Sequence, residues 1–471
     1  MTPNDATVSF MNHLIAWSCA ALFLAAAVAG RMVRGKWVNL LTAFSGFYGL
    51  TVAMANMRLY GINLGSPKTY IIMMLGLFAF GSGYILVVGY YQYTLGKIAF
   101  ESFYSPPPML VPKRDRSVRT TVAVVLLIVV FLYSLYRLYI LYTLLRAGYS
   151  YQMVRTIYFN AEYSFDKDMA ARVGRNPLDI YMIQPLLIGV FFLACINLFS
   201  DAFGFSKKRT LLYWIMSFLS IAITAVSNGG RDIIFYTVFV FAYSFLAMRP
   251  LKKILPKPIL PTKQKKMVIR FGVLAIAAMV VVSIVRASSK KSAPGQDDSG
   301  LFRTFYIYFT GYLPNFSVRL DMMKDDEYTH GFTFLLGLIK FPMAVIKRVI
   351  HFDSPAAYTL ADTLTSRLQK RVSIGGGNMF NAYTSPFYYF YVDFGYISVF
   401  IESMLFGVTC AISEVRFERK KTAYHTFMYL FCFYLIISSM VRWEMVHPKT
   451  AMLLYFVPVI FKLSRKDRDY I

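Results

Sequence analysis

The sequence predicts an all-α polytopic integral membrane protein, and its composition and hydropathy are the observations that predict it. Of the 471 residues, 57% are hydrophobic and 16% are charged, and the mean hydropathy is +0.50. Such a chain has too little polar surface for a water-soluble domain. Apolar segments long enough to cross a hydrocarbon core of about 30 Å recur along it. We therefore expect about 11 transmembrane helices, with one large external loop in the second half of the chain.

The expected spans are joined by short links except in one place. They cover residues 13–30, 37–56, 70–92, 120–145, 179–200, 210–227, 232–248, 268–286, 387–413, 422–441 and 450–463. The chain is thereby divided into residues 1–286 with eight helices, a long loop over residues 287–386, and residues 387–471 with three helices.

The basic residues in the links predict which side of the membrane each link faces. The N-terminal MTPNDATVSF has no Lys or Arg, whereas the next link contains Arg31, Arg34 and Lys36, and this alternation continues along the chain. Positive links stay on the cytoplasmic side. The N-terminus and the loop 287–386 are therefore expected outside, and the C-terminus inside.

Charge and cysteine usage exclude several other classes of protein. The formal net charge of +26 lies mainly in links beside the membrane, where anionic headgroups attract it, so no nucleic-acid partner is expected. All four cysteines fall inside apolar spans, which argues against a disulfide framework. No cluster of His and Cys has the spacing of metal ligands, so neither a metal nor another cofactor is expected.

The long loop contains an apolar piece with basic residues spaced along it. Residues 332–352 read FTFLLGLIKFPMAVIKRVIHF, and Pro342 divides this piece into parts too short to span. We expect an interfacial helical segment that brings the loop down to the lipid surface. The alternative is a helix that only packs the loop against the bundle.

A short external turn, SNGGRDIIF at residues 227–235, has the composition of an anion site. Glycine lets a ligand approach the backbone closely, and Arg231 stands at the start of a helix whose N-terminal amides favour an anion. A phosphate would suit this turn. The alternative is a tight turn in which Asp232 neutralises the arginine.

A second polar stretch comes just before the ninth span and enters it. Asn378, Asn381 and Tyr383 precede the span, and Asp393 lies about two turns into it. A carboxylate at that depth is costly unless it is paired or lines a wet cavity. Asp393 is therefore either a proton acceptor or the partner of an external arginine.

Glu402 follows Asp393 by nine residues. At about 100° per residue, that spacing places the two side chains on nearly opposite faces of one continuous helix. We therefore do not expect them to form an adjacent carboxylate pair.

The layout resembles the Wzy-type O-antigen polymerases, the oligosaccharide repeat-unit polymerase family. The resemblance lies in about eleven spans, one long loop in the second half, Gly230-Arg231 heading a helix, and the run from Gly377-Asn378 to Tyr391-x-Asp393-x-Gly395. The paired R-x10-G motifs described for some members have no counterpart in the external loops; Arg319 and Gly331 come nearest.

The resemblance implies a bacterial inner-membrane glycosyltransferase with its long loop in the periplasm. Such an enzyme joins undecaprenyl-diphosphate-linked oligosaccharide repeat units into O-antigen or a related surface polysaccharide, and a chain-length regulator is a further expected partner. A ligase that moves finished polymer to another lipid shares this layout. A flippase or other transporter of lipid-linked oligosaccharides is the alternative from a different class.

The implied reaction needs cations for the departing diphosphate and a base for the acceptor hydroxyl. We expect Asp393, Arg231 and His351 to be catalytic. The residues expected to bind substrate are Arg286, Arg303, Arg319, Arg442, Asn378, Asn381 and Tyr383.

Overall fold

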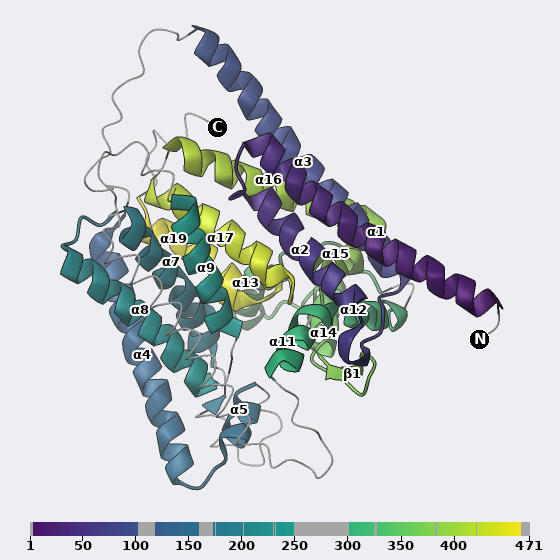
Figure 1. The fold of residues 1–471 in the computed structure, drawn as a ribbon. Helices are drawn as coiled ribbons and strands as arrows, with labels where there is room; N and C mark the ends of the chain where they lie inside the picture. The colour runs from purple at the N-terminus through teal and green to yellow at the C-terminus, as the bar shows by residue number, and fades with distance from the viewer. Residues whose placement is uncertain are drawn as a thin grey trace. The chain divides into compact units, whose positions relative to one another are not determined.

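The chain folds into helices, with one two-stranded hairpin among its described residues, in a computed structural model (Figure 1). The structure describes residues 3–101, 118–159, 173–174, 176–200, 202–228, 230, 232–248, 301–324, 327–381, 384–420 and 422–462. The chain forms two compact units. The first comprises residues 1–110, 297–421 and 431–451, and the second comprises residues 111–296, 422–430 and 452–471.

The first unit contains the two longest helices of the described residues and the whole described part of the expected external loop. Its long helices are α1 (Pro3–Arg34), α2 (Leu40–Asn56), α3 (Pro67–Glu101) and α16 (Tyr396–Lys420). Its shorter elements are η1 (Leu59–Gly61), α11 (Leu301–Thr310), α12 (Tyr312–Asp321), α13 (Leu336–Ile350), α14 (Ala356–Arg367), β1 (Val372–Ser373), β2 (Met379–Phe380), α15 (Pro386–Phe394), η5 (Glu444–Val446) and α18 (Pro448–Ala451).

The second unit is a separate group of helices. It contains α4 (Thr120–Arg146), α5 (Tyr151–Phe159), the π-helix η3 (Asp179–Ile183), α7 (Gln184–Ser200), α8 (Lys207–Asn228), α9 (Asp232–Met248) and α19 (Leu453–Ile460). The helix α17 (Ala423–Ser439) begins in this unit and ends in the first. The π-helix runs directly into Pro185, whose missing N–H disturbs the regular helical ladder.

Several helices have the length and composition of membrane spans, as a multi-pass membrane protein requires. Six are long and apolar enough to cross a membrane, and four shorter apolar stretches accompany them within the described residues. Along α4, large apolar side chains such as Ile128 and Leu132 are exposed, where a water-soluble helix would carry polar groups. The expected span 268–286 lies outside the described residues.

The expected single span over residues 387–413 is wrong, because the chain breaks there into α15 and α16. Gly395 stands between them with φ 68° and ψ −137°, a conformation that suits glycine. The Ser398 hydroxyl accepts a hydrogen bond from the Phe394 amide at 2.8 Å and donates one to the Phe390 carbonyl. Ser398, in the first turn of α16, thereby stabilises the last turn of α15.

The expected division of residues 332–352 at Pro342 is also wrong. The helix α13 continues through this proline over 15 residues. At about 1.5 Å per residue it remains too short to cross a hydrocarbon core.

The helices α3 and α16 pack closely because glycines face the crossing. A Cβ atom added at Gly407 would lie 2.1 Å from the Phe80 carbonyl oxygen, and one added at Gly83 would lie 2.4 Å from that of Met404. Small residues let membrane helices approach in this way. Beside the crossing, the ring of Phe406 lies 5.3 Å from Phe80 and 5.0 Å from the buried Trp443.

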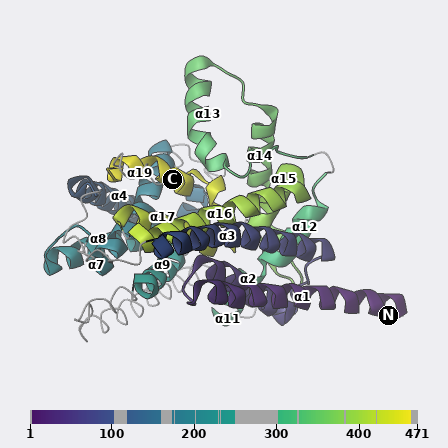
Figure 2. The same cartoon turned by 90° about the horizontal axis from the view of Figure 1, so that it is seen from above.

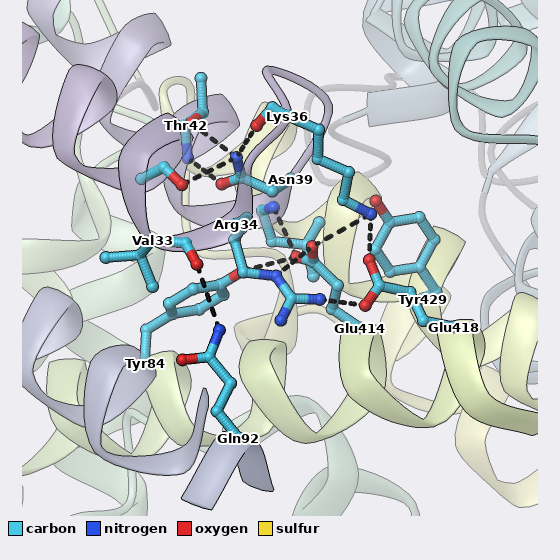
Figure 3. Close-up of polar contacts among 12 residues, drawn as sticks. Val33, Arg34, Lys36, Asn39, Thr42, Tyr84, Gln92, Glu414, Glu418 and Tyr429 are labelled. Atoms are coloured by element: carbon cyan, nitrogen blue, oxygen red, sulfur yellow. Dashed lines mark hydrogen bonds and ion pairs between the residues drawn. The ribbon is translucent and has the colours of Figure 1, made fainter. Parts of the chain in front are cut away.

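At one end of the first unit, two links that were expected on the same side of the membrane are joined by an ionic cluster. Arg34, the last residue of α1, and Lys36 just after it pair with Glu414 and Glu418 in the last turns of α16 (Figure 3). The Glu414 carboxylate is fully buried and also accepts hydrogen bonds from the Leu40 amide at 2.8 Å and the Tyr84 hydroxyl at 2.7 Å.

Segments expected on the opposite side also meet one another. The Asn63 amide donates to the Ile374 carbonyl at 2.9 Å, and the Ser66 amide donates to the Ser317 hydroxyl at 2.7 Å. In the second unit, the Arg119 amide donates to the Ile460 carbonyl at 2.9 Å, which joins an expected cytoplasmic link to the expected cytoplasmic end of the last span. The contacts agree with the predicted alternation, and which side faces the cytoplasm stays a prediction.

Candidate functional site

An open pocket of about 240 Å³ lies among the shorter helices of the first unit. It is lined by Arg319, Met322, Met323, Glu327, Leu364, Arg367, Leu368, Lys370 and Tyr388. All except Tyr388 come from the loop 287–386 of the sequence prediction. Three of its side chains are cations and one is a carboxylate, so the pocket attracts an anion.

Arg319 supplies a fixed positive charge at this pocket. Its side chain is buried, and it donates hydrogen bonds to Asn315 Oδ1 at 3.4 Å, to the Arg367 carbonyl at 3.2 Å, and to the carbonyls of Leu368 and Lys370. Each of these acceptors is neutral. Burial lowers the pKa of the Arg319 guanidinium, and an arginine nevertheless stays protonated. The pocket therefore contains a buried charge that an anionic ligand would neutralise.

Glu327 and Arg367 form an ion pair at the pocket, with Arg367 Nη1 3.1 Å from Glu327 Oε1. The arginine side chain is 49% exposed and the glutamate side chain 16%. The Lys370 ammonium has no ion pair within the described part of the chain. The two outer cations can thus turn toward a ligand, and Glu327 is a carboxylate placed to accept a proton.

The segment that follows the pocket leads to a second polar group. Arg303 donates to Asn378 Oδ1 at 3.0 Å and lies over the ring of Tyr60 at 5.8 Å. Asn378 in turn donates to the Tyr60 carbonyl at 3.1 Å. A guanidinium, an amide and a partly exposed aromatic ring are the groups that bind sugar hydroxyls and sugar ring faces.

The backbone around this group is constrained. Gly375, Gly376 and Gly377 have positive φ in the hairpin between β1 and β2, and Tyr60 has φ 61°. A Cβ atom at Gly376 would lie 2.3 Å from the Tyr60 carbonyl oxygen, so only glycine fits this approach. Non-glycine residues in the left-handed region are uncommon and concentrate at ligand sites.

Four of the predicted substrate-binding residues therefore gather along residues 367–381. Arg319 and Asn381 both donate to main-chain carbonyls there, the latter to Gln369 at 3.0 Å. Arg303 and Asn378 meet at the hairpin tip. Arg442 lies apart from these contacts and pairs with the fully buried Glu444 at 2.6 Å. Their roles in binding stay predictions.

The predicted catalytic residues are not assembled into one constellation in the described part of the chain. Asp393 is fully buried, and its carboxylate accepts hydrogen bonds from the Thr333 amide at 3.0 Å and the Phe334 amide at 2.9 Å. His351 is exposed and ends α13 with φ 54°. Arg231, Arg286 and Tyr383 lie outside the described residues.

The expectation that Asp393 and Glu402 face away from each other is wrong. Their side chains are hydrogen bonded, because the break at Gly395 turns the chain between them. A spacing of nine residues places two side chains on nearly opposite faces only within one continuous helix. Oε2 of Glu402 is buried without a hydrogen-bond partner among the described residues.

Sequence reasoning did not place Glu327, Arg367 and Lys370 at the site. Arg367 was one of many external arginines, and Glu327 and Lys370 stood in polar runs, DDEYTH and RLQKR. Clustered charge in RLQKR was the available signal, yet charge runs usually mark a solvated face.

No protein-family model, no curated protein and no solved structure matches this chain.

Proposed function

We propose that the chain is a membrane glycosyltransferase that joins undecaprenyl-diphosphate-linked oligosaccharide repeat units at the external face of the bacterial inner membrane. The observation that carries the proposal is the pocket with three cations and one carboxylate, together with the Tyr60–Arg303–Asn378 group to which the chain leads from the pocket. The pocket suits a diphosphate, and the Tyr60–Arg303–Asn378 group suits a sugar. The multi-pass architecture gives access to a lipid-linked substrate.

Different residues of the pocket meet the different requirements of the proposed reaction. The bond between the sugar carbon and the diphosphate oxygen breaks, and a bond forms between that carbon and the acceptor hydroxyl oxygen. Arg367 and Lys370 bind the departing diphosphate, with the buried charge of Arg319 behind them. Glu327 takes the proton of the acceptor hydroxyl. Asp393 and His351 remain the rival bases from sequence reasoning.

The test is the banding of surface polysaccharide in a strain that lacks this protein and is complemented with variants. Loss of long chains with retention of single-repeat species identifies a polymerase. Free polymer left on its carrier lipid identifies a ligase. Repeat units trapped on the cytoplasmic face identify a flippase.

Complementation then tests the pocket. Glu327→Gln should reduce chain extension at least about 100-fold, because it removes a general base. Arg367→Gln and Lys370→Gln should each reduce it strongly. The matched control is Lys324→Gln, which changes an exposed lysine outside the pocket and should extend chains normally. If Glu327→Gln gave polysaccharide of normal length and Asp393→Asn gave none, the general base would be Asp393 instead of Glu327.

One observation favours a second candidate, a carrier of lipid-linked oligosaccharides. Discontinuous helices with buried carboxyls occur in transporters, and the break at Gly395 with Asp393 and Glu402 is of this kind. Flux of lipid-linked oligosaccharide across proteoliposomes containing this protein alone would favour the carrier, and polymer formation without flux would exclude it.

A further inference from the structure

The C-terminal half of α13 exposes an apolar stripe. Phe341, Val345 and Val349 follow at intervals of four residues, and their exposed fractions are 40%, 46% and 70%. Residues four apart lie on the same helix face, so these three side chains form one surface. Ile350, the last residue of α13, and Phe352 just beyond the helix are exposed apolar side chains next to this stripe.

Basic residues accompany this stripe, and no acidic residue occurs in α13. Lys347 and Arg348 are exposed and have no ion pair or hydrogen bond from their side chains within the described residues. Lys340 differs, because it pairs with Asp362 of α14 at 2.6 Å. The C-terminal half of α13 thus has both the apolar stripe and two cations that have no acidic partner within the described residues.

The direction of α13 within the first unit fits a helix that lies along a membrane. In Figure 2 it runs across the direction of α3 and α16, two helices with the length of membrane spans, and it forms a hairpin with α14. A helix across the spans lies parallel to the membrane plane. An amphipathic helix with cations beside its apolar face binds at the headgroup boundary in this orientation.

We propose that this α13 surface, formed by Phe341, Val345, Val349, Ile350 and Phe352 with Lys347 and Arg348, binds anionic phospholipid in the bilayer that contains the protein. The apolar side chains insert below the headgroups, and the two cations bind phosphate groups. The unpaired positive charge selects an anionic lipid surface rather than a neutral partner. This inference does not rest on the proposed function.

A spin label can locate the surface in the intact protein. The four native cysteines are buried, so Val349→Cys introduces an accessible thiol for a nitroxide. In nanodiscs of phosphatidylcholine and phosphatidylglycerol, that label should be relaxed by oxygen and shielded from a water-soluble nickel complex. The control label at Ser373→Cys, an exposed position on β1, should show the reverse. Nickel access at residue 349 equal to that at residue 373 would overturn the proposal, as would shielding from both agents.

The binding of lipid phosphate groups by Lys347 and Arg348 is tested separately. Each cation near an anionic surface contributes about 1 kcal/mol, so Lys347→Gln with Arg348→Gln should lower the ratio of inserted to water-exposed label about 30-fold. The same loss should follow when pure phosphatidylcholine replaces the anionic mixture. The control variant Lys324→Gln should leave the ratio unchanged. Insertion of the double variant equal to that of the parent protein in the anionic mixture would overturn the role of the cations.

Discussion

The side chains of Asp393 and Glu402 are hydrogen bonded to each other across the break between α15 and α16. Asp393 already accepts bonds from the Thr329 hydroxyl and the amides of Thr333 and Phe334. A carboxylate is suited to accept from so many donors. We infer that the shared proton belongs to Glu402, which donates it to Asp393. The pair thereby fastens the segment before α13 to the helix break.

This arrangement predicts different costs for changes at its two members. Glu402→Gln keeps a neutral hydrogen-bond donor and should change the free energy of unfolding by less than about 1 kcal/mol. Asp393→Ala leaves a hydroxyl and two amides without their acceptor and should cost about 3 kcal/mol or more. Thermal unfolding in detergent measures both. An equal loss from the two variants would show that Glu402 is needed as a carboxylate instead.

Arg319→Lys should loosen the turn that forms the pocket. The guanidinium reaches several main-chain carbonyls at once, whereas an ammonium lacks this planar fork. We expect a loss of about 2 kcal/mol and faster amide exchange around residues 367–370. Arg371→Lys, at an exposed position of the same segment, is the control and should leave exchange unchanged. Unaltered protection in Arg319→Lys would contradict the positioning role.

Glu414→Ala should destabilise the cluster shown in Figure 3 far more than Glu418→Ala does. The Glu414 side chain is fully buried, and its removal leaves the Leu40 amide and the Tyr84 hydroxyl without their acceptor, which costs about 3 kcal/mol. Glu418 is 33% exposed, so water replaces its contacts and the cost is about 1 kcal/mol or less. The unfolding temperatures of the two variants measure these losses. Similar temperatures would contradict the expected difference between Glu414 and Glu418.

Acid should weaken the first unit through Glu444. Burial by itself raises the pKa of this carboxyl, but the charges of Arg442 and Lys449 and the hydrogen bonds from Arg442 and Thr450 outweigh it and lower the pKa to about 2. Its contribution of about 3 kcal/mol is present above the ordinary pKa of about 4.3 and is lost as the pH falls toward 2. Glu444→Gln should show lower stability at neutral pH and a flatter profile between pH 4.5 and about 2. A variant with an unchanged acid slope would rule out this residue as the source.

Chelation should not stop the proposed reaction. Arg319, Arg367 and Lys370 provide the positive charge that a leaving diphosphate needs, so EDTA is expected to leave polymer formation intact. Polymer formation in washed membranes with and without EDTA measures this. Inhibition that magnesium reverses would show that a divalent ion shares the task.

The membrane class and most of the helices follow from the sequence alone. The spans expected at 120–145, 210–227 and 232–248 correspond closely to α4, α8 and α9. Hydropathy is a sum over neighbouring residues and needs no partner from elsewhere in the chain, which is why a local pattern sufficed. Charge counts in the links predicted which links share a side of the membrane, and the contact between Arg34 and Glu414 agrees with that prediction.

Only the tertiary structure decided where helices break and which distant side chains meet. The φ of Gly395 ends α15, and that single dihedral brings Glu402 to Asp393 against the expectation from helical spacing. The pocket brings Arg319 and Glu327 together with Arg367 and Lys370. In the sequence, the helix α13 and most of α14 lie between these two pairs. Such contacts depend on long-range packing rather than on local periodicity, so the sequence could supply candidate charges but not their grouping.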